Sequence, residues 1–87
     1  MNVEKGLVVK AVAGRDKNLY FAVLDADSRF ALIADGKSRR LENPKRKNIR
    51  HLMPTGRKIC LDEITNKKLK RALSEFYSLT QPESGGK

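Results

Sequence analysis

The sequence predicts a small, mainly β domain with five short antiparallel strands and one C-terminal helix. Three observations predict this fold class. The chain has only 87 residues, which is below the usual size for two hydrophobic cores. Its first half carries short runs of valine, leucine and aromatic residues separated by turn-forming residues. Near its end, apolar residues recur at every third or fourth position, which is typical of an amphipathic helix.

The first three strands are predicted in the apolar segment 7–34, in which 18 of 28 residues are hydrophobic. Strands over 7–13 and 19–24 are joined by Gly-Arg-Asp-Lys-Asn, a connection of hairpin length. A turn at 25–28 leads to a third strand at 30–34. In the first strand both alternating faces carry apolar side chains, so the sequence leaves open which face belongs to the core.

Two further strands are predicted in the polar segment that follows. Asp35-Gly36 suits a type I′ hairpin, so we expect the chain to return as a strand over 37–41. Asn43-Pro44 then breaks regular structure, and 48–53 is the fifth strand candidate, closed by Pro54-Thr55-Gly56. A strongly twisted sheet of this size can close on itself. We therefore expect a small SH3-like five-stranded barrel.

The last regular element is a helix within residues 63–79. Asp62 is favoured over Thr65 as its N-cap, because a cap at Thr65 would place two lysines beside the positive helix end. We expect the apolar stripe of the helix to cover an open end of the barrel. The predicted organisation is a barrel over 1–61, a helix packed on it over 62–80, and a disordered tail over 81–87. The stripe consists of Leu69, Ala72, Leu73, Phe76 and Tyr77.

Positive charge is concentrated in one part of the chain. The formal net charge is +9, and residues 37–58 contribute nine Lys or Arg against a single Glu. Like charges repel one another, so such a cluster indicates a polyanionic partner: nucleic acid, an anionic membrane or an acidic protein. A solvated basic face without a partner is the alternative interpretation.

Other classes of protein find little support in the sequence. The longest apolar run has six residues, 19–24, whereas a membrane span needs about twenty. The first residues lack the order of a secretory signal, so we expect a cytoplasmic protein without a membrane partner. The single Cys60 and His51 cannot form a tetrahedral metal set, and Cys60 is expected to be buried. No catalytic motif occurs, so we expect no enzyme and no cofactor.

The sequence resembles a known RNA-binding motif. Gly6-Leu7-Val8-Val9, Ala13 to Asn18 and Ile33 to Gly36 resemble the KOW motif of ribosomal and transcription-elongation proteins. The stretch from Asn43 to Leu52, followed by Pro54-Thr55, is similar to the region after the KOW unit in the family of the eukaryotic and archaeal large-subunit ribosomal protein numbered fourteen. The resemblance covers residues 6–56. It implies an SH3-like barrel that binds ribosomal or other structured RNA through its first loop and the basic segment, with a role in translation.

The expected RNA contacts divide into cations and polar side chains. The cations contact phosphates without sequence specificity. Asn48 reads a base edge or merely caps a turn, and His51 contacts RNA or is a plain surface residue. Charge reversal of residues 45–47 together is expected to abolish RNA binding and leave the fold intact. The assigned residues are Arg15, Lys17, Arg39, Arg40, Lys45, Arg46, Lys47, Asn48, Arg50 and His51.

Two alternatives to a ribosomal role remain open. One is an SH3-like protein-interaction module, which would need an exposed aromatic cage of Tyr20 with Phe21 or Phe30. The other is transcription elongation through nascent RNA or polymerase. All five aromatic residues are expected in the core, which disfavours binding of single strands by serial stacking. We expect a monomer, with ribosomal proteins as further candidate partners.

Overall fold

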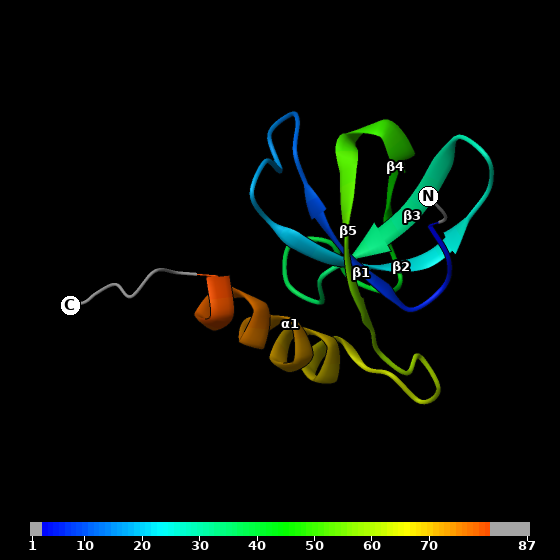
Figure 1. Ribbon diagram of the computed structural model, residues 1–87. Helices are drawn as coiled ribbons and strands as arrows, with labels where there is room; N and C mark the ends of the chain where they lie inside the picture. Colours follow the sequence, from blue (N-terminus) through cyan, green and yellow to red (C-terminus); the bar gives the residue numbers. More distant parts are fainter. Residues whose placement is uncertain (1–2, 81–87) are drawn as a thin grey trace.

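The computed structural model describes residues 3–80 and consists of one five-stranded antiparallel sheet followed by a helix (Figure 1). The strand order is β4-β3-β2-β1-β5. The mainly β prediction with one C-terminal helix is therefore confirmed, while the predicted tail over 81–87 lies outside the described residues. The elements are β1 (Leu7–Ala11), β2 (Tyr20–Ala26), β3 (Phe30–Ala34), β4 (Lys45–Asn48), the 3₁₀ turn η1 (Ile49–His51), β5 (Leu52–Lys58) and α1 (Asn66–Thr80).

The sheet is curled because its two outer strands follow each other in the chain. β4 and β5 lie at opposite ends of the strand order, yet only η1 separates them. In a flat sheet, four strand spacings would hold them about 19 Å apart. The chain from Asn48 to Leu52 reaches at most about 14 Å. The sheet must therefore bend its edges toward each other, although β4 and β5 are not paired in the described sheet.

Apolar side chains of β1 are buried on both faces of the sheet, which answers the question that the sequence left open for this strand. On the face enclosed by the curl, Val9 and Phe21 belong to a core that also includes Leu52 of β5. On the opposite face, Val8 packs with Leu69 and other apolar residues of α1. α1 thus covers the outer face of the sheet. The prediction that it covers an open end of the barrel is wrong.

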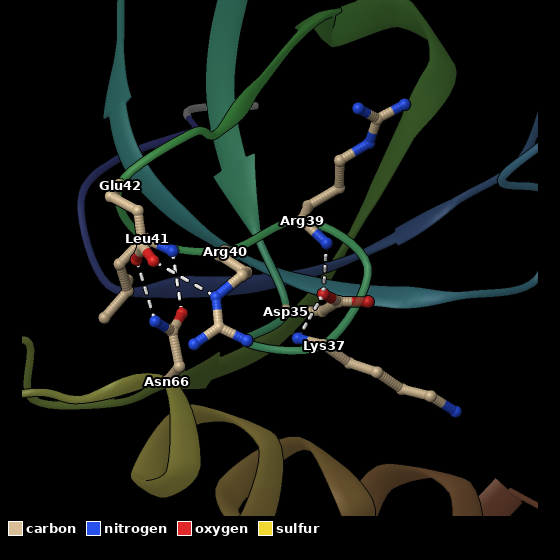
Figure 2. Close-up of polar contacts among 7 residues, drawn as sticks. All are labelled: Asp35, Lys37, Arg39, Arg40, Leu41, Glu42 and Asn66. Atoms are coloured by element: carbon tan, nitrogen blue, oxygen red, sulfur yellow. Dashed lines mark hydrogen bonds and ion pairs between the residues drawn. The ribbon is translucent and has the colours of Figure 1, made fainter.

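The predicted strand over 37–41 does not form, because the side chain of Asp35 accepts hydrogen bonds from backbone amides that strand pairing would otherwise use. Its Oδ1 accepts hydrogen bonds from the amides of Lys37 at 2.9 Å and Arg39 at 2.8 Å (Figure 2). The segment is a loop, and the strand that pairs with β3 comes later, at Lys45. Gly36 has the expected positive φ, +78°, but it does not lie in a two-residue hairpin.

The predicted strand over 48–53 is instead the junction of three elements. Asn48 ends β4, η1 follows, and β5 begins at Leu52. β5 also continues through Pro54 to Lys58, whereas the sequence predicted that the strand ends at the proline. Proline is tolerated there because β5 is an outer strand of the sheet.

The helix begins three residues later than predicted, and Thr65 is its cap. The Thr65 hydroxyl accepts a hydrogen bond from the Lys68 amide at 3.1 Å, and Asp62 lies in the preceding turn. Glu63 adopts a positive φ of 57°, which is incompatible with a continuous helix from Asp62. Cys60, predicted to be buried, is exposed. In residues 3–80, no helix has the length and apolar character that crossing a bilayer requires.

Candidate nucleic-acid interface

Three connections meet at one end of the curled sheet, which is at the top of Figure 1. They are the β1–β2 loop (residues 12–19), the β2–β3 turn (27–29) and η1. The amide of Val12 donates to the carbonyl of His51 at 2.9 Å, and the amide of Ile49 donates to the carbonyl of Arg29 at 2.9 Å. η1 therefore links the other two connections, and we call the three together the loop end.

The β1–β2 loop is shaped by two residues in the left-handed region. Gly14 has φ +82° and Asn18 has φ +75°. The Asn18 amide donates to the carbonyl of Ala11 at 2.7 Å, which closes the loop onto the end of β1. Asparagine is, after glycine, one of the residues that most readily adopt this conformation. Between these two residues, the side chains of Arg15 and Lys17 are exposed.

Asp16, between those cations, anchors the loop to β4. Its carboxylate pairs with Lys45 at 2.5 Å and with Lys47 at 3.7 Å. The Lys47 amine also donates to the carbonyl of Ala13 at 3.0 Å. The Lys45 hydrogen bond lowers the pKa of Asp16, and the charges of Lys45, Lys47 and Arg39 lower it further, against an opposing contribution from burial.

The strand register explains why these two lysines face inward. Lys47 lies opposite Ala31 and Lys45 opposite Ile33, both of which belong to the enclosed core. Lys47 is only 7% exposed. Its amine is used for contacts with Asp16 and Ala13 inside the protein and is not available to a phosphate. From this burial we expect charge reversal over 45–47 to destabilise the fold, so it would not test RNA binding alone as the sequence suggested.

Arg46 alternates with the two lysines and lies on the other face of β4. Its guanidinium carbon lies 3.9 Å from the centroid of the Phe30 ring. Arg46 is exposed and Phe30 is half-buried. Phe30 is thus a partial exception to the expectation that all aromatic residues lie in the core.

The β2–β3 turn presents a cation that the sequence reasoning missed. The Asp27 carboxylate accepts hydrogen bonds from the amides of Arg29 and Phe30, both at 2.8 Å. The hydrogen bonds from the Phe30 and Arg29 amides lower the pKa of Asp27. Arg29 is exposed beside η1. The Asp-x-Arg sequence of this turn was a signal for this cation. It lies in residues 1–36, however, where five basic and five acidic residues cancel and no charge cluster is visible.

η1 is held by a cap of its own. The side-chain Oδ1 of Asn48 accepts a hydrogen bond from the Arg50 amide at 2.9 Å. Asn48 therefore has the capping role that was its alternative interpretation, and this oxygen is not free to read a base. Arg50 and His51 are exposed, and His51 ends the 3₁₀ turn instead of lying within a strand.

The 35–42 loop carries Arg39 and Arg40, whose side chains differ in direction (Figure 2). The Arg40 guanidinium donates to Glu42 at 3.1 Å. Glu42 also accepts from Asn66 at 2.8 Å, and these contacts, led by the Asn66 hydrogen bond, lower its pKa to about 2. The Asn66 side chain in turn accepts from the Leu41 amide at 2.8 Å. Arg40 is therefore engaged near the start of α1, whereas Arg39 points away from the helix.

The ten predicted residues therefore fall into separate groups. Four lie together and exposed at the loop end, and the missed Arg29 joins them. Lys45, Lys47 and Asn48 form contacts within the fold, and Arg40 pairs with Glu42. Arg39 lies near Asp16, and Arg46 lies over the Phe30 ring. Within residues 3–80, none of the exposed cations of the loop end is in an ion pair. The four predicted residues at the loop end are Arg15, Lys17, Arg50 and His51.

The described residues do not form an aromatic cage from Tyr20 and Phe21 or a cluster of metal ligands. Tyr20 and Phe21 are buried, so they do not form the exposed cage that would favour a protein-interaction module. In the described part of the chain, no three His, Cys, Asp or Glu side chains gather as metal ligands would. A search of protein-family models finds no match for this sequence.

Proposed function

We propose that the protein binds structured RNA, in particular ribosomal RNA, through its loop end, and that it acts in the translation apparatus. The observation that carries the proposal is the group of exposed cations on three adjoining connections, with no acidic partner among residues 3–80. Arginine and lysine side chains presented in this way bind phosphates through charge and hydrogen bonds. No turnover is part of the proposal.

The fold that we propose for this function is an SH3-like barrel of the KOW type. The curled sheet, the short connection between its outer strands and the enclosed core support it. The β1–β2 loop, which carries the KOW resemblance, contributes Arg15 and Lys17 to the loop end. The ion pairs of Asp16 hold this loop against β4.

Charge reversal at the loop end tests the proposal. The variant Arg15→Glu/Lys17→Glu/Arg50→Glu changes three exposed side chains without an ion pair, so we expect it to fold and to lose RNA binding. A matched control, Lys67→Glu/Lys68→Glu/Arg71→Glu, makes the same charge change on exposed residues of α1. Gel-shift titration with ribosomal RNA measures both variants. Equal affinity of the two variants would contradict the proposal.

Co-sedimentation with ribosomal subunits separates this function from its alternatives. A ribosomal protein is expected to stay with subunits at low salt and to dissociate as salt screens the phosphate contacts. A transcription-elongation factor would instead sediment with polymerase, and a protein-interaction module with neither. Loss of co-sedimentation in the loop-end variant, but not in the α1 control, assigns the contact to this surface.

A further inference from the structure

A cleft lies between the β2–β3 turn and η1, within the loop end. Its volume is about 340 Å³, which falls in the range of about 300–1,000 Å³ that small-molecule sites occupy. The hydrogen bond from the Ile49 amide to the Arg29 carbonyl joins its two walls. The cleft is lined by Ser28, Arg29, Phe30, Asn48, Ile49 and Arg50.

The cleft is basic, and its charges are not neutralised from within. Arg29 and Arg50 both line it, and no acidic side chain does. Neither arginine forms an ion pair with a residue in the 3–80 range. A pair of guanidinium groups at one small cleft is suited to a phosphate, because each planar fork can donate two hydrogen bonds to phosphate oxygens.

Phe30 gives the same cleft an aromatic wall. Phe30 lines this cleft and also a second hollow, of about 240 Å³, which is lined by Arg46 but by neither Arg29 nor Arg50. The Arg46 guanidinium lies over the Phe30 ring, and Arg46 lines that second hollow. Arg46 does not line the basic cleft, so it leaves room there for a planar base to pack against Phe30.

The side chains of Asp27 and Asn48 fix the backbone of the residues that line the cleft. The Asp27 carboxylate binds the amides of Arg29 and Phe30, and the Asn48 side chain binds the amide of Arg50. The backbone under both arginines is thus fixed before a ligand arrives. A fixed backbone reduces the ordering that binding would otherwise require.

We propose that this cleft binds one unpaired nucleotide, with its phosphate at Arg29 and Arg50 and its base against Phe30. The inference rests on the proposed RNA binding and specifies the ligand of one part of the same surface. A base within a duplex is stacked on both sides and cannot reach the ring, so the nucleotide belongs to a bulge, a loop or an end.

Adenosine 5′-monophosphate and ribose 5-phosphate are the probes that test this cleft. Both are titrated into the full-length protein at low salt, and amide chemical shifts are followed by NMR. The amides of Arg29, Phe30, Ile49 and Arg50 report on the cleft because all four residues line it. We expect both probes to shift these amides, and the nucleotide to bind at least about fivefold more tightly because its base stacks.

Three variants assign the two halves of the ligand. Phe30→Leu keeps an apolar side chain and is expected to reduce the affinity for the nucleotide to that for ribose 5-phosphate. Arg29→Ala/Arg50→Ala is expected to lose both probes, whereas the control Arg71→Ala, an exposed arginine of α1, keeps them. Equal affinities of the two probes in the wild type, or shifts spread evenly over the basic residues of α1, would overturn the proposal.

The RNA gel shift keeps this inference separate from the proposed function. If the wild type binds ribosomal RNA but the nucleotide leaves the cleft amides unshifted, only the nucleotide site is wrong. If charge reversal at the loop end leaves RNA affinity unchanged, RNA binding by this surface is wrong whatever the probes do.

Discussion

Asp16 is the residue on which the placement of the first loop depends. Its side chain is 15% exposed and contacts two lysines of β4. One of them, Lys47, is buried, and its amine has one other polar contact among residues 3–80, the Ala13 carbonyl. Loss of the carboxylate charge would therefore leave a buried amine without its counter-charge, which is an unfavourable arrangement.

We predict that Asp16→Asn lowers the free energy of unfolding by about 1–2 kcal/mol at pH 7. The pKa of Asp16 is lowered in the folded state, so its contribution is present above the unfolded pKa and is lost as pH falls through the folded pKa. Urea denaturation at pH 7 and near pH 2 measures the difference from the wild type. A difference that stays constant down to pH 2 would contradict the assignment.

At the residue scale, local conformation was easier to predict than the direction of a side chain. Asn18 and Gly36 take the positive φ that their types favour. The inward direction of Lys47 depends on where β4 begins, because a shift of one residue exchanges the faces of a strand. The sequence placed no strand over residues 45–47, so it offered no reason to separate Lys47 from Arg46.

Single elements depart from prediction where distant side chains fix their ends. The start of α1 is the main example, because Asn66 bonds to Leu41 and Glu42 on the 35–42 loop. The helix dipole favoured Asp62 as the cap, because a cap at Thr65 places two lysines near the positive N-terminus of the helix. That preference is worth less than about 1 kcal/mol. Contacts across 24 and 25 residues of sequence are outside the reach of such a local argument.

Thr65→Ala tests the observed cap. We expect it to lower the free energy of unfolding by about 1 kcal/mol, because the Lys68 amide loses its acceptor. Asp62→Ala is the matched control and is expected to change stability little. Thermal denaturation followed by circular dichroism compares them, and a larger effect at Asp62 would return the cap to the position first predicted.

The contact between the 35–42 loop and α1 is tested by Gly36→Ala. A Cβ at Gly36 would lie only 2.2 Å from the Asn66 carbonyl oxygen, so the loop and the helix must separate. Gly56 is the control, because it has a similar φ of +83° but no atom within 4 Å of an added Cβ. We expect Gly56→Ala to cost about 1–2 kcal/mol and Gly36→Ala about 1–3 kcal/mol more. Equal losses of stability in denaturant titrations would contradict the close contact.

At the scale of the whole molecule, the basic segment of the sequence is not one basic surface. Residues 37–58 contribute cations to the 35–42 loop, to both faces of β4, to η1 and to the end of β5. The charge cluster was visible in the sequence, but its division among these places follows from the curl of the sheet. The curl also brings in Arg29, which is 20 residues before Ile49 in the chain.

The number of accessible cations predicts the salt dependence of binding. If five of the cations in the basic segment each contacted a phosphate, the slope of log affinity against log salt concentration would be about −3.5 to −4.5. The four exposed Arg and Lys side chains at the loop end predict a slope of about −2.8 to −3.6. Lys47→Met is expected to leave this slope unchanged, whereas Arg50→Ala reduces its magnitude by about 0.7–0.9. Titrations at four or more salt concentrations measure it, and a slope near zero would contradict phosphate contact.

The three residues of η1 connect the two borders of the sheet. A single cut of the backbone after Arg50 would therefore release β4 and β5 from each other at once, and the curl would lose the link that maintains it. Arg50 and His51 are exposed, so trypsin can reach this peptide bond without prior unfolding of the core. The rate of this one cleavage would measure how firmly η1 is held, and a bound ligand at the loop end would slow it.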